Sequence, residues 1–94
     1  MSFNLPFISI IIATFNSEKT LEDCLLSVFA QNYKNFEVII IDGCSSDSTL
    51  KIIKSFSEKI FYIISEPDDG VYDAWNKGIK KSRGQWILFL GSDD

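Results

Sequence analysis

The chain has 94 residues, of which 46% are hydrophobic, nine are basic and thirteen are acidic. This composition is typical of one small globular domain, or part of one, and it excludes low-complexity disorder. The net charge of −4 argues against a nucleic-acid backbone as the main partner.

Two cysteines occur without a CxxC motif, and histidine is absent from the sequence. This pattern indicates neither a zinc site nor a disulfide framework, and it favours a reducing compartment. The N-terminal residues lack the basic region and apolar core of a signal peptide, and no apolar run approaches the roughly 18 residues of a membrane-spanning helix. We therefore expect a cytoplasmic location, with the inner face of the membrane reached only through segments beyond residue 94.

The first two predicted elements are a strand and an amphipathic helix. Residues 7–13 are rich in β-branched side chains and predict a buried strand. Residues 18–31 place apolar side chains at helical spacing, with Asn16 or Ser17 available as the N-cap.

A second strand and helix follow. Residues 36–41 predict a buried strand that ends at Asp42. The next helix can be capped by Ser46 or Asp47. Its apolar face comprises Leu50, Ile53 and Phe56.

The third strand is predicted over residues 59–64, is shorter, and is expected near the edge of the sheet. The acidic, turn-rich loop 65–70 comes next. A third helix ends at the basic stretch 80–83 and Gly84. Its apolar side comprises Val71, Ala74, Trp75, Gly78 and Ile79.

The last predicted strand, residues 86–90, is an uninterrupted apolar run, which suits a strand covered on both faces. It leads to the adjacent carboxylates of Asp93 and Asp94. Two such carboxylates repel each other, and a bound divalent cation would cancel that repulsion. The alternative is that both side chains lie in a solvated loop and bind no metal. Trp75 and Trp86 are expected in the core rather than as a platform for a sugar.

The alternation of strands and helices predicts an α/β fold with a doubly wound, mostly parallel four-stranded sheet and helices on both faces. The carboxyl ends of all strands in such a sheet lie on one rim, where ligands bind. The residues on this rim are 14–16, Asp42, Asp68 and 93–94. The opposite rim, with Tyr33, Ser57 and Arg83, is expected to hold only ordinary loop residues.

The sequence has no GxGxxG and no GxxxxGK[ST] motif, so phosphate would be held through a metal rather than by a glycine-rich cradle. Asp42, at the tip of the second strand, is placed to bind a ribose hydroxyl or a base edge. The pair Asp93 and Asp94 suits Mg²⁺ or Mn²⁺, which prefer oxygen ligands and bridge phosphates.

Four segments occur in a characteristic order: ISIIIATFN (8–16), FEVIIIDGCSSDST (36–49), SEPDDGVYDAWNKGI (65–79) and GQWILFLGSDD (84–94). Together they resemble the inverting family 2 glycosyltransferases of the GT-A fold. The resemblance implies a nucleotide-sugar donor, above all a UDP-sugar, a divalent metal (Mn²⁺ or Mg²⁺), and transfer with inversion to a carbohydrate or lipid-linked acceptor in polysaccharide or glycolipid biosynthesis.

The resemblance also implies a division of the whole enzyme. Residues 1–94 correspond to its nucleotide-sugar-binding part, which ends after the DxD-like motif. The acceptor-binding half and the general base are then expected beyond residue 94, so this segment alone would bind the donor nucleotide without catalysing transfer.

Residue by residue, the resemblance places Thr14 and Phe15 beside the base, with Asn16 and Glu18 next to them. Asp42 is similar to the family acid that contacts the uracil or the ribose. These five residues form the first half of the implied nucleotide site.

The second half of the implied site comes from later segments. Asp68 matches the acid in the loop after the third strand, and Asn76 matches the helix asparagine that supports the site. Asp93 is expected towards the ribose, and Asp94 towards the metal bound to the diphosphate.

Two positions depart from the family's pattern. Gly91 stands where the family often has a first acid, which removes one metal ligand, and Ala13 replaces a frequent proline. Simpler roles stay open for three residues: Asn16 and Asp47 as helix caps, and Asp68 as part of a turn.

Two other functions are compatible with a doubly wound sheet. One is a non-catalytic nucleotide-binding or interaction module. The other is a receiver-like phosphoacceptor domain, which requires an acid pair after the first strand and a lysine after the last, whereas residues 14–16 and 91–92 supply neither. An uncovered fourth strand would expose a sheet edge and apolar surface, so we expect a homo-oligomer through that edge.

Overall fold

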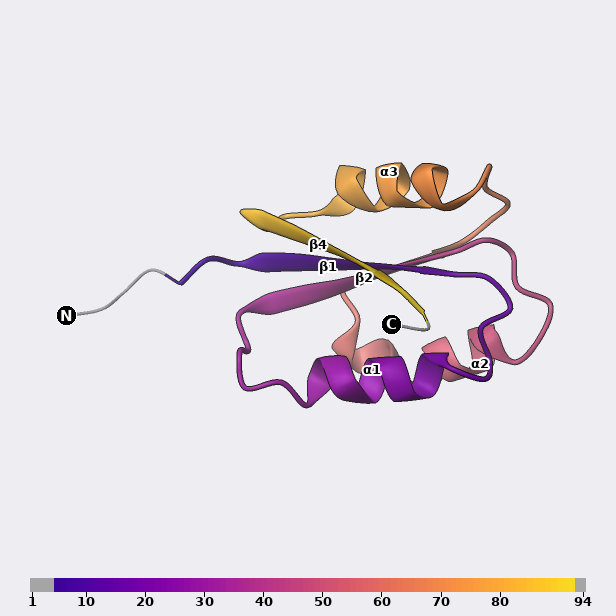
Figure 1. The fold of residues 1–94 in the computed structure, drawn as a ribbon, viewed down its shortest axis with the longest axis horizontal. Helices are drawn as coiled ribbons and strands as arrows, with labels where there is room; N and C mark the ends of the chain where they lie inside the picture. Colours follow the sequence, from indigo (N-terminus) through magenta and orange to yellow (C-terminus); the bar gives the residue numbers. More distant parts are fainter. Residues whose placement is uncertain (1–4, 93–94) are drawn as a thin grey trace.

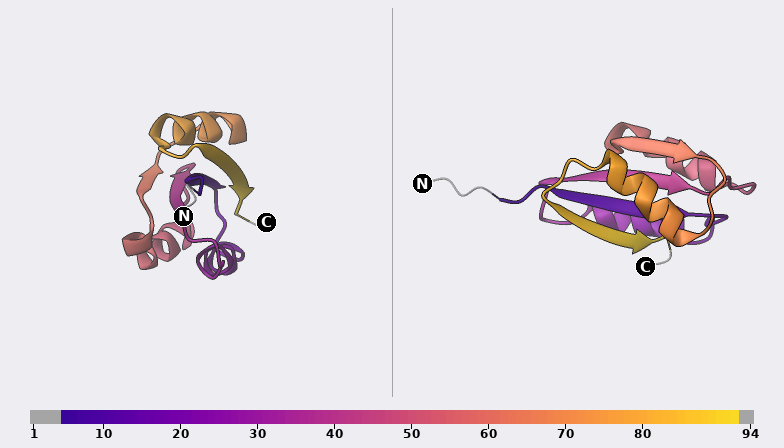
Figure 2. Two further views of the ribbon diagram at one scale, coloured as in Figure 1. Left: turned by 90° about the vertical axis from the view of Figure 1, so that its left-hand side faces the viewer. Right: turned by 90° about the horizontal axis from the view of Figure 1, so that it is seen from above.

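The computed structural model describes residues 5–92 and places four parallel strands between two layers of helices (Figures 1 and 2). The strands are β1 (Ile8–Thr14), β2 (Phe36–Asp42), β3 (Tyr62–Ser65) and β4 (Trp86–Gly91). The helices are α1 (Leu21–Phe29), α2 (Thr49–Ser55) and α3 (Val71–Lys81), with a short 3-10 helix η1 (Ser57–Lys59). The predicted α/β fold with a parallel sheet is confirmed.

The strand order is β3-β2-β1-β4, so β1 and β2 are central and β3 lies at one edge, as expected. The helices α1 and α2 cover one face of the sheet and α3 covers the other (Figure 1). Every neighbouring pair of strands is parallel, and each connection passes over a face of the sheet.

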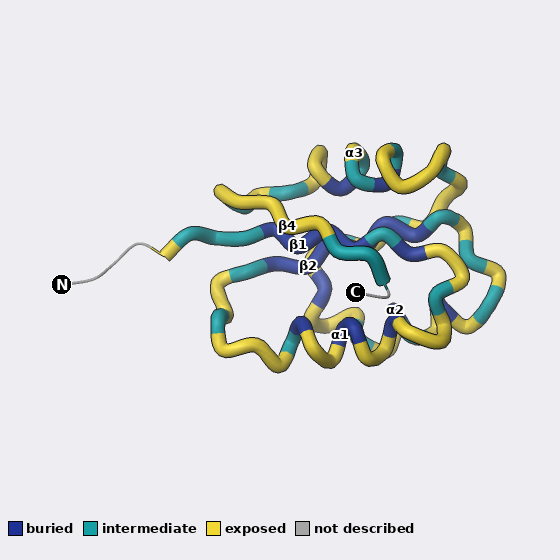
Figure 3. The backbone as a smooth tube through the Cα atoms, in the orientation of Figure 1, coloured by how far each residue is buried: buried dark blue, intermediate teal, exposed yellow. Residues whose placement is uncertain are grey.

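The core has two parts because β1 and β2 are covered on both faces. Ile10 and Ile12 belong to the cluster that includes α1 and α2, whereas Ile11 packs in the cluster that includes Ala74 of α3. The continuous isoleucine run of β1 therefore follows from burial on both sides. Figure 3 shows the two central strands as the most buried part of the chain.

The first helix begins later than predicted. A turn precedes it, in which the backbone carbonyl of Ser17 accepts hydrogen bonds from the N–H groups of Thr20 (3.1 Å) and Leu21 (3.0 Å). Thr20 occupies the N-cap position, so the prediction that Asn16 or Ser17 caps this helix is wrong.

The third strand is also shorter than predicted. Residues Ser57–Lys59 form η1, and the strand begins only at Tyr62. Ile60 is buried between the two, which accounts for the apolar character that favoured a strand there.

Within residues 5–92, β4 pairs only with β1 and forms an edge of the sheet, so the prediction of a strand covered on both faces is wrong for the described chain. Trp86 is 66% exposed rather than in the core. Trp75 is half-buried and packs against Phe89, with ring centroids 4.9 Å apart. The exposed apolar residues on this strand are Trp86, Ile87, Leu88 and Phe89.

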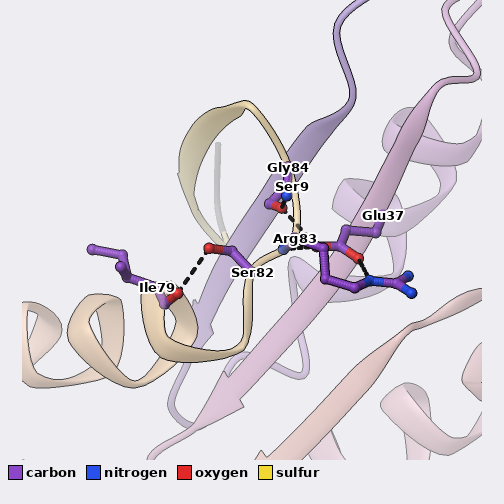
Figure 4. A network of polar contacts seen from close by, with 6 residues as sticks. All are labelled: Ser9, Glu37, Ile79, Ser82, Arg83 and Gly84. Atoms are coloured by element: carbon purple, nitrogen blue, oxygen red, sulfur yellow. Dashed lines mark hydrogen bonds and ion pairs between the residues drawn. The ribbon is translucent and has the colours of Figure 1, made fainter.

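A polar network fastens the α3–β4 connection to the amino ends of β1 and β2 (Figure 4). The buried carboxylate of Glu37 accepts hydrogen bonds from the Ser9 hydroxyl (2.6 Å) and from the backbone N–H and Nε of Arg83 (2.8 Å each). The Ser9 Oγ accepts from the Gly84 N–H (2.8 Å). The rim opposite the candidate site thus holds a structural network that the sequence did not reveal.

No helix within residues 5–92 is long and apolar enough to cross a bilayer.

Candidate functional site

The strand register brings polar residues together at the carboxyl rim of the sheet. Thr14 is paired with Asp42, and Asp42 with Ser65, so three strand ends stand side by side. Ala13 is paired with Gly91 at the end of β4. Residues up to 78 positions apart in the sequence therefore lie in one row of strand ends, as expected for a parallel sheet.

Asp42 is the centre of this rim. It is fully buried, and its carboxylate accepts hydrogen bonds from the hydroxyls of Thr14 (2.6 Å), Ser45 (2.6 Å) and Ser65 (2.7 Å) and from the Ser45 N–H (2.8 Å). Burial opposes ionisation, but these hydrogen bonds outweigh it and hold the pKa of Asp42 below its ordinary value. The carboxylate therefore carries its charge while organising three loops.

Asn16 joins the β1 and β2 loops. Its backbone N–H donates to the Ser45 Oγ (2.8 Å), and its side-chain Oδ1 accepts from the Ser46 N–H (2.9 Å). Its φ of 47° lies in the left-handed region, which asparagine tolerates better than most residues. The structure thus gives Asn16 a bridging role instead of a helix cap.

A second set of contacts ties the turn before α1 to the start of α2. The Ser17 N–H donates to the Thr49 Oγ1 (2.7 Å), and the Glu18 N–H donates to the Asp47 carboxylate (3.3 Å). Glu18 in turn accepts from the Ser48 N–H (3.3 Å). Asp47 also accepts from the N–H of Thr49 (2.9 Å). Ser48 occupies the N-cap position of α2, so the prediction that Ser46 or Asp47 caps this helix is wrong.

The end of β4 is held beside the β1 loop. The Ser92 hydroxyl donates to the Ser17 Oγ (2.5 Å). This contact holds Ser92 beside the turn that precedes α1. Asp93 and Asp94 lie outside the described residues, so their predicted roles towards ribose and metal stay predictions.

The loop after β3 forms a turn that the sequence anticipated. The Asp68 Oδ1 accepts a hydrogen bond from the Gly70 N–H (3.1 Å), and Gly70 has a φ of 106° that favours glycine. Asp68 is half-buried and faces the row of strand tips. A turn role and a binding role are therefore compatible for this residue.

Lys77 of α3 holds the same loop in place. Its ammonium group donates to the Pro67 carbonyl (3.0 Å) and lies 3.2 Å from the Glu66 carboxylate and 3.4 Å from that of Asp73. The lysine contacts three oxygen atoms of the loop and helix. These contacts restrain the loop that carries Asp68.

Two adjoining cavities open on this rim. The first, about 400 Å³, is bounded by residues 13–15, Gly43, Asp68 and the first residues of α3. The second, about 590 Å³, is bounded by residues 15–20, Asp47 and the end of β4. Ala13, Phe15 and Val71 line both, and the volumes fall in the range of small-molecule sites.

The predicted site residues divide between these cavities. Thr14, Phe15 and Asp68 line the first, and Phe15, Asn16 and Glu18 line the second. Asp42 lies beneath the rim and lines neither. Asn76 is exposed on α3 and also lines neither, so its supporting role stays a prediction.

Several rim residues were missed by the sequence analysis. Gly43, Val71 and Lys19 line the cavities, and Ser45 and Ser65 bind Asp42. The spacing Asp42 to Ser45 could have indicated the first of these bonds, since an aspartate often accepts hydrogen bonds from the turn that follows it. The contact of Ser65 depends on strand pairing and carries no local signal.

The second cavity has the chemistry that a hard divalent cation requires, because its polar lining consists largely of oxygen donors from Ser17, Glu18, Asp47 and Ser92. Within residues 5–92, however, no three acidic, histidine or cysteine side chains converge as a complete ligand set. The described residues therefore fit one side of a metal site, whose predicted ligands follow directly at the end of β4.

Comparison with known proteins identifies the family. The model of the family described as "Glycosyl transferase family 2" matches residues 9–94. The chain belongs to glycosyl transferase family 2. This assignment replaces the receiver-like alternative.

Curated relatives agree with the assignment. The chain is 42% identical over 92 residues to a PGL/p-HBAD biosynthesis glycosyltransferase of Mycobacterium bovis, covering 95% of this chain and 36% of that protein. It is also 42% identical over 95 residues to the Methanococcus voltae dolichyl N-acetyl-alpha-D-glucosaminyl phosphate 3-beta-D-2,3-diacetamido-2,3-dideoxy-beta-D-glucuronosyltransferase, covering 94% of this chain and 29% of that protein. The chain thus spans about a third of the length of these relatives.

Solved structures share the fold. TarS of S. aureus is 32% identical with a TM-score of 0.86, over 94% of this chain and 28% of that one. A mannosyltransferase from Pyrobaculum calidifontis, solved with GDP-Man and Mn²⁺, has a TM-score of 0.87 over 94% of this chain and 28% of that one. The latter is only 22% identical, so it shows the fold alone.

Proposed function

We propose that residues 1–94 form the donor-binding part of a metal-dependent, inverting glycosyltransferase that uses a UDP-sugar. The observation that carries this proposal is the pair of adjoining cavities on the carboxyl rim. The first has apolar walls and one carboxylate, which suits a base, and the second is rich in oxygen donors beside the β4 end, which suits a metal-bound diphosphate.

The ligands of related proteins support a UDP-sugar donor and a divalent metal. TarS of S. aureus was solved in complex with UDP-GlcNAc. A glucosyl-3-phosphoglycerate synthase of Mycobacterium tuberculosis, of the same fold, was solved with UDP and Mn²⁺. These ligands belong to those proteins, and their chemistry matches what the two cavities present here.

The residues around the two cavities have separate tasks. Phe15 presents a ring that is 62% exposed at the junction of the two cavities, where a base can stack on it. Thr14 fixes the end of β1 through its bond to Asp42. Asn16 and Glu18 keep the loop that separates base from diphosphate in one conformation through their bonds to the β2–α2 loop.

At the end of β4, we assign Asp93 to the ribose and Asp94 to the metal. A bound Mn²⁺ or Mg²⁺ supplies Lewis-acid stabilisation of the charge that develops on the leaving diphosphate. The chain's own contribution is to hold the β4 end near the α1 turn through the contact between Ser92 and Ser17.

For the whole protein we propose transfer to a carbohydrate or lipid-linked acceptor in polysaccharide or glycolipid biosynthesis, in the cytoplasm or at the inner face of the membrane. The general base and the acceptor site belong to segments beyond residue 94. The exposed apolar residues of β4 form a surface for those segments or for a second copy of the chain.

The test is consumption of a UDP-sugar by the full-length protein with Mn²⁺, and the same assay with a chelator. Asp94→Asn should abolish turnover, whereas the isosteric control Glu58→Gln, on the exposed η1 at the opposite rim, should leave it unchanged. Nucleotide binding without turnover for any acceptor would favour the non-catalytic binding module instead.

A further inference from the structure

The buried Asp42 is not available to read a base. Its two carboxylate oxygens accept four hydrogen bonds from the protein, two at each oxygen. An ionised carboxylate has about four acceptor positions, so this set leaves none for a ligand. Asp42 is also fully buried and lines neither cavity.

Asp68 is the carboxylate that the first cavity does present. Its Oδ1 accepts from the Gly70 N–H (3.1 Å), and among residues 5–92 no donor reaches its Oδ2. The rest of the cavity wall near it is apolar or backbone, including Val71 and Ala74. A ligand that brings an N–H donor into the cavity can form a charge-assisted hydrogen bond to this half-buried oxygen.

The residue after Asp42 makes room for this carboxylate. A Cβ placed on Gly43 would lie 3.0 Å from the Asp68 Oδ2. The backbone of Gly43 is outside the left-handed region, since Gly70 is the glycine with a positive φ among the described residues. The absence of a side chain at position 43 therefore serves the approach of Asp68 rather than the backbone conformation.

We infer that Asp68, given space by Gly43, determines base specificity by accepting the imide N–H of uracil or thymine. This inference rests on the proposed function and names its nucleotide. An imide presents one N–H donor, which matches the Oδ2 of Asp68, an oxygen that no donor among residues 5–92 reaches. Cytosine and adenine carry a ring nitrogen acceptor at the equivalent position and are repelled. The guanine edge has two adjacent N–H donors, and the Asp68 Oδ1 keeps one acceptor position beside its bond from Gly70, so the titration of GDP decides between uracil and guanine.

The test is calorimetric titration of UDP, dTDP, CDP, GDP and ADP, with Mn²⁺, into the full-length protein and its Asp68→Asn variant. Asparagine keeps the oxygen that binds the Gly70 N–H and replaces the free oxygen by an amide donor. We expect UDP to bind about 10- to 100-fold more weakly, and CDP to bind more tightly, because its ring nitrogen can accept the new donor. The ratio of UDP to CDP affinity is the readout, since a general loss of structure would lower both.

Two further variants complete the design. Asp69→Asn removes the same charge one residue away, outside both cavities, and should leave the ratio unchanged. Gly43→Ala should weaken UDP binding by displacing the Asp68 carboxylate, without altering CDP binding to the same degree. Comparison of UDP with dTDP measures the combined effect of the thymine methyl group and the missing 2′-hydroxyl.

The outcomes separate the two claims. UDP binding with an unchanged UDP-to-CDP ratio in Asp68→Asn overturns this inference and leaves the proposed function standing. Equal affinity of the unmodified protein for UDP, CDP and GDP has the same meaning. Failure of the unmodified protein to bind any of the five nucleotides overturns the proposed function itself.

Discussion

Replacing Asp42 tests whether this carboxylate holds the rim together. Asp42→Ala leaves the Thr14 hydroxyl and the Ser45 N–H and hydroxyl without their acceptor. The exposed Ser65 hydroxyl can turn to water, but the Ser45 amide cannot rotate. An unpaired buried donor costs about 1–3 kcal/mol, so we expect a loss of about 3–5 kcal/mol in the free energy of unfolding.

Asp42→Asn is the matched variant. The amide can turn so that its oxygen accepts from the Ser45 N–H and the Ser65 hydroxyl, while its NH₂ group faces the hydroxyls of Thr14 and Ser45, which can accept. Only the charge-assisted part of the bonds is lost, so we expect about 1–2 kcal/mol. Urea unfolding, followed by far-ultraviolet circular dichroism and by tryptophan fluorescence, measures both variants.

The stabilisation by Asp42 depends on pH. The pKa of Asp42 is lowered in the folded protein, so the unfolded chain takes up its proton first as the pH falls through about 3.9. The stabilisation by Asp42 is thus present above that pH and is lost as the pH falls towards the folded pKa. The stability gap between the natural protein and Asp42→Asn should close over this range, and a gap that is absent at pH 7 or constant with pH would refute the role given to Asp42.

Three other changes have defined outcomes. Phe15→Ala should weaken UDP binding by roughly 5- to 150-fold with little change in the urea midpoint, since stacking is worth about 1–3 kcal/mol and the ring is 62% exposed; unchanged affinity would remove Phe15 from the base site. Gly84→Ala should cost about 2–3 kcal/mol, because the new Cβ would lie 2.5 Å from the Ser9 nitrogen, and an unchanged urea midpoint would show that the α3–β4 connection can shift. Burial opposes the charge of Glu37, but hydrogen bonds from Ser9 and Arg83 outweigh it and lower its pKa, so Glu37→Gln should cost about 1.5–3 kcal/mol at pH 7 and less in acid. A cost for Glu37→Gln that grows as the pH falls would contradict that sign.

The sheet was predictable because its central strands carry their burial in the sequence. A run such as residues 8–14 has no polar alternation, and the structure covers it on both faces. The same reasoning was wrong for residues 86–91. An apolar run predicts that a strand is buried, but it does not indicate which segment covers the strand. Trp86 is exposed here although its neighbours in sequence resemble those of a central strand.

The sequence was sufficient to predict which strand ends form the candidate site. Parallel strands end on one rim, so Thr14, Asp42 and Asp68 were expected near one another, and the register confirms the first two as partners. Which carboxylate faces the cavity was not predictable. That outcome depends on hydrogen bonds from Ser45 and Ser65 to Asp42, which follow from loop geometry and strand pairing rather than from local sequence.

We propose above all that this rim binds a nucleoside diphosphate together with a metal. The most direct test is calorimetric titration of UDP into the full-length protein, once with Mn²⁺ and once with a chelator. We expect saturable binding that depends on Mn²⁺ and that Asp94→Asn abolishes. Equal binding in the presence of the chelator, or no binding of any nucleoside diphosphate with Mn²⁺ present, would contradict it.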